Sequence, residues 1–219
     1  MKIKICLFIL IIAVTVGLGQ QRADTLTVPY DPALDEWVSI DGYVDVEENE
    51  YPGSFRDPVT GITVYWGCDD SLIYLALEAK GKGWLAIGFG SPVMNGANML
   101  IGYYTDDSAV VVNHVGKGKM HATVKGTAEL LVDWDVDYDE ETNTTTMEFI
   151  YPLNWEGLTG TAITGITHGG TYDLILARNA KSVSFAAKHG QKSSYRFHLL
   201  APRPGVETKD QSTQEQKGQ

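Results

Sequence analysis

The chain has 219 residues, of which 43% are hydrophobic and 10% aromatic, so it can bury a sizeable core and is not disordered as a whole. Its formal net charge of -11 argues against binding to nucleic acid or to an anionic membrane surface, because both need clustered Lys and Arg. The 23 glycines and the frequent Thr, Val and Tyr residues favour strands and tight turns.

The first residues are typical of a secretory signal peptide. Lys2 and Lys4 give a positive start, residues 5–16 are apolar, and residues 17–19 offer small side chains for cleavage. The apolar run is short for a membrane span, although an uncleaved N-terminal anchor is the alternative. We therefore expect residues 1–19 to be removed and the mature protein to be secreted, extracellular or periplasmic, without membrane insertion of its own.

After a polar, proline-containing lead-in over residues 20–36, the sequence predicts many short strands separated by turn residues. No stretch keeps helical spacing over three turns, so the pattern is typical of an all-β sandwich or barrel. The polar residues 201–219 are expected to form a disordered tail. The predicted strands cover residues 37–40, 62–66, 72–79, 84–89, 99–104, 109–112, 130–138, 145–151, 172–177, 182–187 and 194–200.

Common enzyme motifs are missing from this pattern. There is no G-x-S-x-G elbow for a serine hydrolase and no helix behind the glycines of residues 88–90 to bind a dinucleotide. His114 and His121 flank a Gly-Lys-Gly-Lys stretch, but two histidines without a third spaced ligand are a poor metal site, so a flexible loop is favoured there. Covalent c-type haem attachment is excluded, because no C-x-x-C-H occurs.

Two separated pieces carry a recognisable pattern. Residues 83–102 read G-W-x-x-x-G-F, then a turn that presents Met94, then G-A-x-M-x-I-G; residues 173–194 contain a histidine, His189, followed by Gly and a basic residue. This pattern resembles the DOMON superfamily over residues 37–200. The resemblance implies a single domain with an antiparallel immunoglobulin-like β-sandwich.

In haem-binding members of that superfamily, such as the cytochrome domain of cellobiose dehydrogenase, a methionine and a histidine hold the iron. The resemblance therefore implies non-covalent haem b with Met94 and His189 as the axial ligands. Met99 is the rival methionine, expected in the core, and Lys188 is a rival because one branch uses lysine. Three aromatic residues are expected to wall the haem pocket, although core packing explains them equally well: Trp84, Phe89 and Tyr103.

Two strong axial ligands leave no open position on the iron, which favours electron transfer with a redox partner protein, membrane-bound or secreted, over catalysis of bond chemistry. Haem-free, sugar-binding members of the superfamily provide the alternative, a carbohydrate- or ligand-binding module that uses Trp66, Trp84 and Trp155. A third hypothesis is an adhesion or matrix domain whose polar tail contacts other surfaces.

Overall fold

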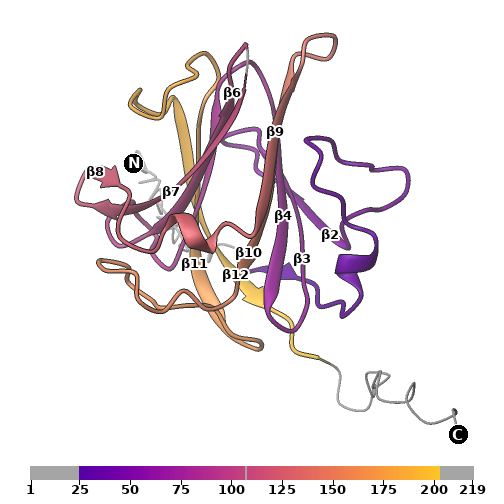
Figure 1. Ribbon diagram of the computed structural model, residues 1–219, viewed down its shortest axis with the longest axis vertical. Helices are drawn as coiled ribbons and strands as arrows, with labels where there is room; N and C mark the ends of the chain where they lie inside the picture. The colour runs from indigo at the N-terminus through magenta and orange to yellow at the C-terminus, as the bar shows by residue number, and fades with distance from the viewer. Residues whose placement is uncertain (1–24, 107, 203–219) are drawn as a thin grey trace, which may run out of the picture.

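The computed structural model describes residues 25–106 and 108–202, which form two β-sheets packed face to face (Figure 1). The seven-stranded sheet contains, in spatial order, β1 (Thr25–Val28), β12 (Gln191–Leu199), β11 (Thr171–Asn179), β5 (Trp84–Phe89), β6 (Asn98–Tyr104), β7 (Ala109–Lys117) and β8 (Met120–Ala122). The five-stranded sheet contains β2 (Gly53–Arg56), β3 (Thr63–Cys68), β4 (Leu72–Lys80), β10 (Thr144–Pro152) and β9 (Asp133–Asp139). Two single-turn 3-10 helices, η1 (Leu34–Glu36) and η2 (Ala128–Leu130), lie in the connections.

The predicted all-β sandwich is confirmed. All neighbouring strands are antiparallel except β1, which pairs with β12 in parallel. Within the extended lead-in expected over residues 20–36, residues 25–28 form an edge strand of the larger sheet, and Val28 is buried in the core. The expected signal peptide, residues 1–19, lies outside the described residues, as does the tail from residue 203 onward.

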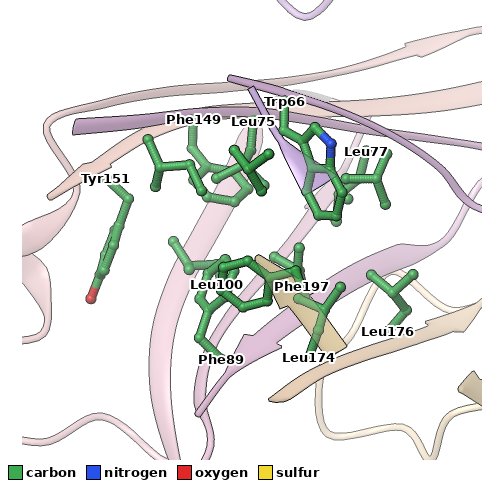
Figure 2. Close-up of a cluster of buried hydrophobic side chains, with 14 of the residues drawn as sticks. Trp66, Leu75, Leu77, Phe89, Leu100, Phe149, Tyr151, Leu174, Leu176 and Phe197 are labelled. Atoms are coloured by element: carbon green, nitrogen blue, oxygen red, sulfur yellow. The ribbon is translucent and has the colours of Figure 1, made fainter. Parts of the chain in front are cut away.

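The core between the sheets follows from the two-residue alternation of strand side chains. Figure 2 shows Trp66, Leu75, Leu77 and Phe149 of the smaller sheet facing Phe89, Leu100, Leu174, Leu176 and Phe197 of the larger one. Gly102 lies on the same inner face against Met147, where even a methyl group would collide. This close approach explains a glycine in the middle of β6.

Two predicted strands are irregular in the structure. Residues 37–40 have no strand partner, and the Ser39 amide donates to the Glu50 carboxylate instead. Residues 182–187 also form no strand, because the Ser182 and Ser184 side chains hydrogen-bond backbone groups of their own segment. Such local bonds compete with a β-ladder. Within the described ranges, no helix has the length and apolar character of a membrane span.

Candidate functional site

The outer face of the seven-stranded sheet carries a second hydrophobic layer. Antiparallel sheets commonly leave one face to solvent, so buried apolar side chains on the face away from the core form a second packed layer. We call this layer the outer-face cluster. It consists of Trp84, Ala86, Ala97, Met99 and Ile101, with Met94, Tyr103, Val112, Ile175, Ala177 and Phe185 packed against them.

The alternation along β5 decides which predicted aromatic residues reach this face. Trp84 points outward and is 5% exposed, and Tyr103 of β6 shares its cluster. Phe89 has the opposite parity and is 1% exposed in the core, where its ring lies 5.8 Å from that of Phe197. The structure therefore brings Trp84 and Tyr103 together, and the expectation that Phe89 lines the same site is corrected.

The segment of residues 180–190, which joins β11 to β12, covers the outer-face cluster. Its Phe185 ring lies 6.0 Å from Tyr103 and meets His114 edge-on at 5.1 Å, measured between ring centroids. The Trp84 amide donates to the Ser182 carbonyl, at 3.0 Å, which ties the segment to the start of β5. The segment thus acts as a cover that shields the apolar face from water.

Met94 lies in the β5–β6 connection, half-buried against β7. A side chain at Gly116 would overlap the Met94 carbonyl, so the glycine permits this close approach. The turn is tied to the β7–β8 hairpin, since the Gly118 amide donates to the Asn95 side chain at 2.7 Å and the Gly96 amide donates to the Gly116 carbonyl at 2.9 Å. The backbone around Met94 is therefore fixed by bonds that do not involve its thioether.

His189 lies half-buried at the other end of β5. Burial, followed by the charges of Lys192 and Lys188, lowers the pKa of the His189 imidazole below its ordinary value, which favours the neutral ring that metal ligation requires. Asn179 pairs with Trp84 at the start of β5, whereas the connection with Met94 follows its last residue. Met94 and His189 thus approach the outer face from opposite ends of a six-residue strand, about 17 Å long at 3.3 Å per residue step.

The Trp84 side chain has an unsatisfied group on this face. Its indole Nε1 is buried and has no hydrogen-bond partner. An unpaired buried donor costs about 1–3 kcal/mol, so it is a ready partner for an acceptor such as a carboxylate of a bound molecule. Imidazole and thioether donors fit haem iron, and an apolar face with one free N–H fits a porphyrin that bears carboxylates. These side chains therefore offer the types of donor that a haem b group takes.

The rival ligands occupy different places. Met99 is buried within the outer-face cluster itself, not in the core between the sheets where it was expected. Lys188 is exposed, and its carbonyl accepts a bond from the Asn179 side chain. Met94 and His189 lie at the two ends of β5, beside the apolar face.

His114 is the outer-face residue that the sequence analysis missed. Residues 113–117 continue β7 beyond the strand predicted over residues 109–112, and His114 is 5% exposed beneath Phe185 rather than in a flexible loop. Side chains alternate between the two faces of a strand, so a predicted strand extended to residue 114 would have placed His114 on the same outer face as Val112. His121 lies beside it on β8.

A separate pocket of 440 Å³ lies outside the five-stranded sheet, in the loop before β2. Its rim includes two exposed aromatic residues, Trp37 at 48% and Tyr43 at 68%. By contrast, the three tryptophans of the sugar-binding hypothesis are buried: Trp66, Trp84 and Trp155. The lining is otherwise polar and acidic: Ser39, Asp41, Asp45, Glu48, Asn49 and Glu50.

Glu148 of β10 holds the pocket loop against the sheet. Its fully buried carboxylate accepts hydrogen bonds from the Tyr51 hydroxyl at 2.7 Å and from the backbone amides of Asp41 and Gly42 at 3.1 and 2.9 Å. Burial nevertheless raises the pKa of the Glu148 carboxyl to about 7. The native state therefore keeps a proton there that the unfolded chain releases near pH 4.5.

Replacing Glu148 by Gln is expected to flatten the pH dependence of stability. In wild type this carboxyl stabilises the fold fully below pH 4.5, and that contribution, about 3 kcal/mol, is lost as pH rises through 7. Glutamine mimics the protonated acid, so Glu148→Gln should keep more stability than wild type on going from pH 5 to pH 8. Urea unfolding at both values measures this, and an equal loss in both proteins would contradict the prediction.

Comparisons with known proteins agree with this architecture. The DOMON domain profile matches residues 60–179. One similar solved structure is the cytochrome b domain of pyranose dehydrogenase from Coprinopsis cinerea, at 14% identity and a TM-score of 0.47, with 66% of this chain and 86% of that chain covered. Another is the cytochrome domain of Myriococcum thermophilum cellobiose dehydrogenase, at 19% identity and a TM-score of 0.47, with 69% of this chain and 92% of that chain covered. A family 9 carbohydrate-binding module from Caldicellulosiruptor kristjanssonii in complex with glucose is also similar, at 12% identity and a TM-score of 0.45, with 84% of this chain and 100% of that chain covered.

Likenesses of this degree carry no argument about ligands. A comparison with curated proteins gives no match. The family profile covers more than half of the chain and includes β5, the Met94 turn and β11. The chain therefore belongs to the DOMON domain family.

Proposed function

We propose that this protein binds haem b on the outer face of its seven-stranded sheet and transfers electrons. The observation that carries the proposal is the outer-face cluster, a buried apolar layer with Met94 and His189 at opposite ends of β5. Met94 and His189 would hold the iron, and their donor atoms would have to close from the two ends of β5 to about 4 Å apart, at about 2 Å per bond.

Each group on this face has a defined task in the proposal. Haem, when bound, supplies a one-electron couple, and Met/His coordination favours a raised reduction potential. His189 is kept neutral by burial and by its lysine neighbours, so its ring nitrogen is available without loss of a proton. Trp84 donates its free indole N–H to a haem carboxylate. Tyr103 and Phe185 exclude water from the apolar face.

The proposed partner is another redox protein outside the cytoplasm. We expect the secreted protein to present an acidic surface, because the net charge is -11. Such a surface attracts partners that carry a basic patch, and the attraction weakens as salt rises. We propose that the domain carries electrons and that bond chemistry takes place in the partner.

An absorption spectrum of the full chain, purified after expression with ample haem, tests the proposal. We expect a coloured protein with a six-coordinate low-spin spectrum that changes reversibly on reduction. Titration of haem into haem-free protein should saturate at one haem per chain. A colourless protein that takes up no haem in the titration would overturn the proposal.

Carbohydrate binding is the second candidate, and we propose the pocket loop as its site because Trp66, Trp84 and Trp155 are buried. The exposed rings of Trp37 and Tyr43 lie beside carboxylates, a combination that can stack on a sugar and accept hydrogen bonds from its hydroxyls. Calorimetry against a glycan panel tests this, with Trp37→Ala expected to abolish binding and Trp134→Ala, on β9, as the exposed control. Absence of binding to every glycan would end this candidate.

A further inference from the structure

The β7–β8 hairpin brings two imidazoles together beside the outer-face cluster. The Nδ1 atoms of His114 and His121 lie 2.8 Å apart, and the ring centroids lie 5.0 Å apart. His121 pairs with Gly116, two residues beyond His114 on the same strand, so the rings are diagonal neighbours on one face. The Nδ1 atom of each ring therefore faces the Nδ1 atom of the other.

Both rings are neutral near pH 7. Burial, and second the charge of His121, lowers the pKa of His114 to about 4, and burial also lowers the pKa of His121. Between two neutral rings, one Nδ1–H donates and the other Nδ1 accepts, so the pair shares a single proton. A cation with affinity for imidazole nitrogen can replace that proton and bind both Nδ1 atoms.

We propose that His114 and His121 form a two-coordinate site for monovalent copper, Cu(I). Copper binds imidazole strongly, and its monovalent ion accepts a pair of ligands in line. Structural zinc takes four ligands, and calcium and magnesium take oxygen. In the part of the chain that the structure describes, no group of three or more His, Cys, Asp or Glu side chains is placed to hold a metal. The proposal does not rest on haem binding.

The charges around the pair also favour a monovalent ion. Lys117, the last residue of β7, and Lys119, in the turn that follows, are both exposed, and their repulsion is twice as large for a divalent cation as for a monovalent one at the same place. Phe185 covers His114 edge-on, which limits access of water to this side of the site. A site with two uncharged imidazole ligands, shielded on one side, suits the singly charged Cu(I) ion.

The hairpin can accommodate the ion with a small adjustment. Two bonds of about 2.0 Å in line require the Nδ1 atoms to separate from 2.8 Å to about 4 Å. His121 lies on β8, a three-residue edge strand, and the turn before it passes through Gly118 at φ 62°. Because β7 is the one strand neighbour of β8 among residues 25–106 and 108–202, β8 can move by about 1 Å without breaking a second ladder there.

Anaerobic competition with a chromophoric Cu(I) chelator, on the haem-free full chain, tests the site. We expect one Cu(I) per chain in wild type, affinity at least about 100-fold lower in His121→Gln, and wild-type binding in the control His198→Gln. His198 is a histidine on β12 that pairs with Thr171 instead. His114→Gln is the second variant, and thermal unfolding checks that each variant folds.

X-ray absorption at the copper edge adds a structural readout. Two nitrogen ligands and no sulfur are expected, although the Met94 side chain lies near, against Gly116. Binding that is unchanged in His121→Gln, no binding in wild type, or a sulfur ligand would each overturn the proposal. Haem titration of the same variants distinguishes the two proposals, because His121→Gln should lose copper and keep haem.

Discussion

Replacing His189 by Ala should lower haem affinity by about 100-fold or more. Loss of an outer-shell partner of a metal ligand already costs about 10–100-fold, so loss of a ligand should cost at least the upper end of that range. The ring lies half-buried in the cover segment rather than in the core, so the fold should persist. His198→Ala, on β12, is the matched control and should bind haem like wild type.

Met94 offers the second half of this test. Met94→Leu keeps the volume and apolar character of the side chain and removes only the sulfur, while the turn around it is held by backbone bonds. We expect the absorption spectra of the oxidised and reduced variant to show five-coordinate instead of six-coordinate haem iron. Met99→Leu, within the outer-face cluster, should leave the spectrum unchanged. Wild-type spectra for both His189→Ala and Met94→Leu, or a change in Met99→Leu alone, would show that the ligands are assigned wrongly.

Strands with a continuous apolar run or a clear alternation were the ones that could be predicted from sequence. Residues 84–89 coincide with β5, and the apolar pattern of residues 72–79 falls on β4, which ends one residue later. Short edge strands such as β1 and β8 escaped prediction, because they bury one residue or none and lack a hydrophobic pattern of their own. β1 pairs with β12, which is far away in sequence, and β8 pairs with β7 across a turn. Local strand propensity does not encode such pairings.

The candidate site divides in the same way. The turn with Met94 and the segment with His189 follow from motifs, whereas the face between them follows from strand parity. Phe89 could have been excluded on that ground, since it shares parity with Leu85 and Ile87 rather than with Trp84. The cover segment could not have been foreseen, because Ser182 and Ser184 satisfy the backbone locally in a stretch that otherwise reads as a strand.

The same face holds both proposed sites, and its composition explains why. β5 and β11 present small residues outward at Ala86, Gly88 and Ala177, and the Ile175 and Met99 side chains pack over Gly88. Phe185 contacts both Tyr103 and His114, so the cover segment packs on the face proposed for haem and on one histidine of the proposed copper site. Occupancy of one site should therefore alter the environment of the other, which a haem spectrum recorded with and without Cu(I) would detect.

The buried carboxylate of Asp57 is the strongest polar tie between the two sheets. Asp57 follows β2 of the smaller sheet. Its carboxylate accepts hydrogen bonds from two hydroxyls of β12 in the larger sheet, those of Tyr195, at 2.6 Å, and Ser193. It also accepts bonds from the Thr60 hydroxyl and amide and from the Val59 amide. Burial raises the pKa of Asp57, but these hydrogen bonds outweigh it and lower the pKa below its ordinary value.

Asp57→Ala should therefore destabilise the fold by about 4 kcal/mol, because it leaves several donors without an acceptor in a region closed to water. For a domain of this size that corresponds to a fall in Tm of about 10 °C. The lowered pKa also means that wild type should lose this contribution as pH falls through the native pKa, while the variant should not. Thermal unfolding at pH 7 and pH 3 measures both effects, with exposed Glu47→Ala expected within about 0.5 kcal/mol of wild type. A loss below about 1 kcal/mol in Asp57→Ala would mean that apolar packing alone holds the sheets together.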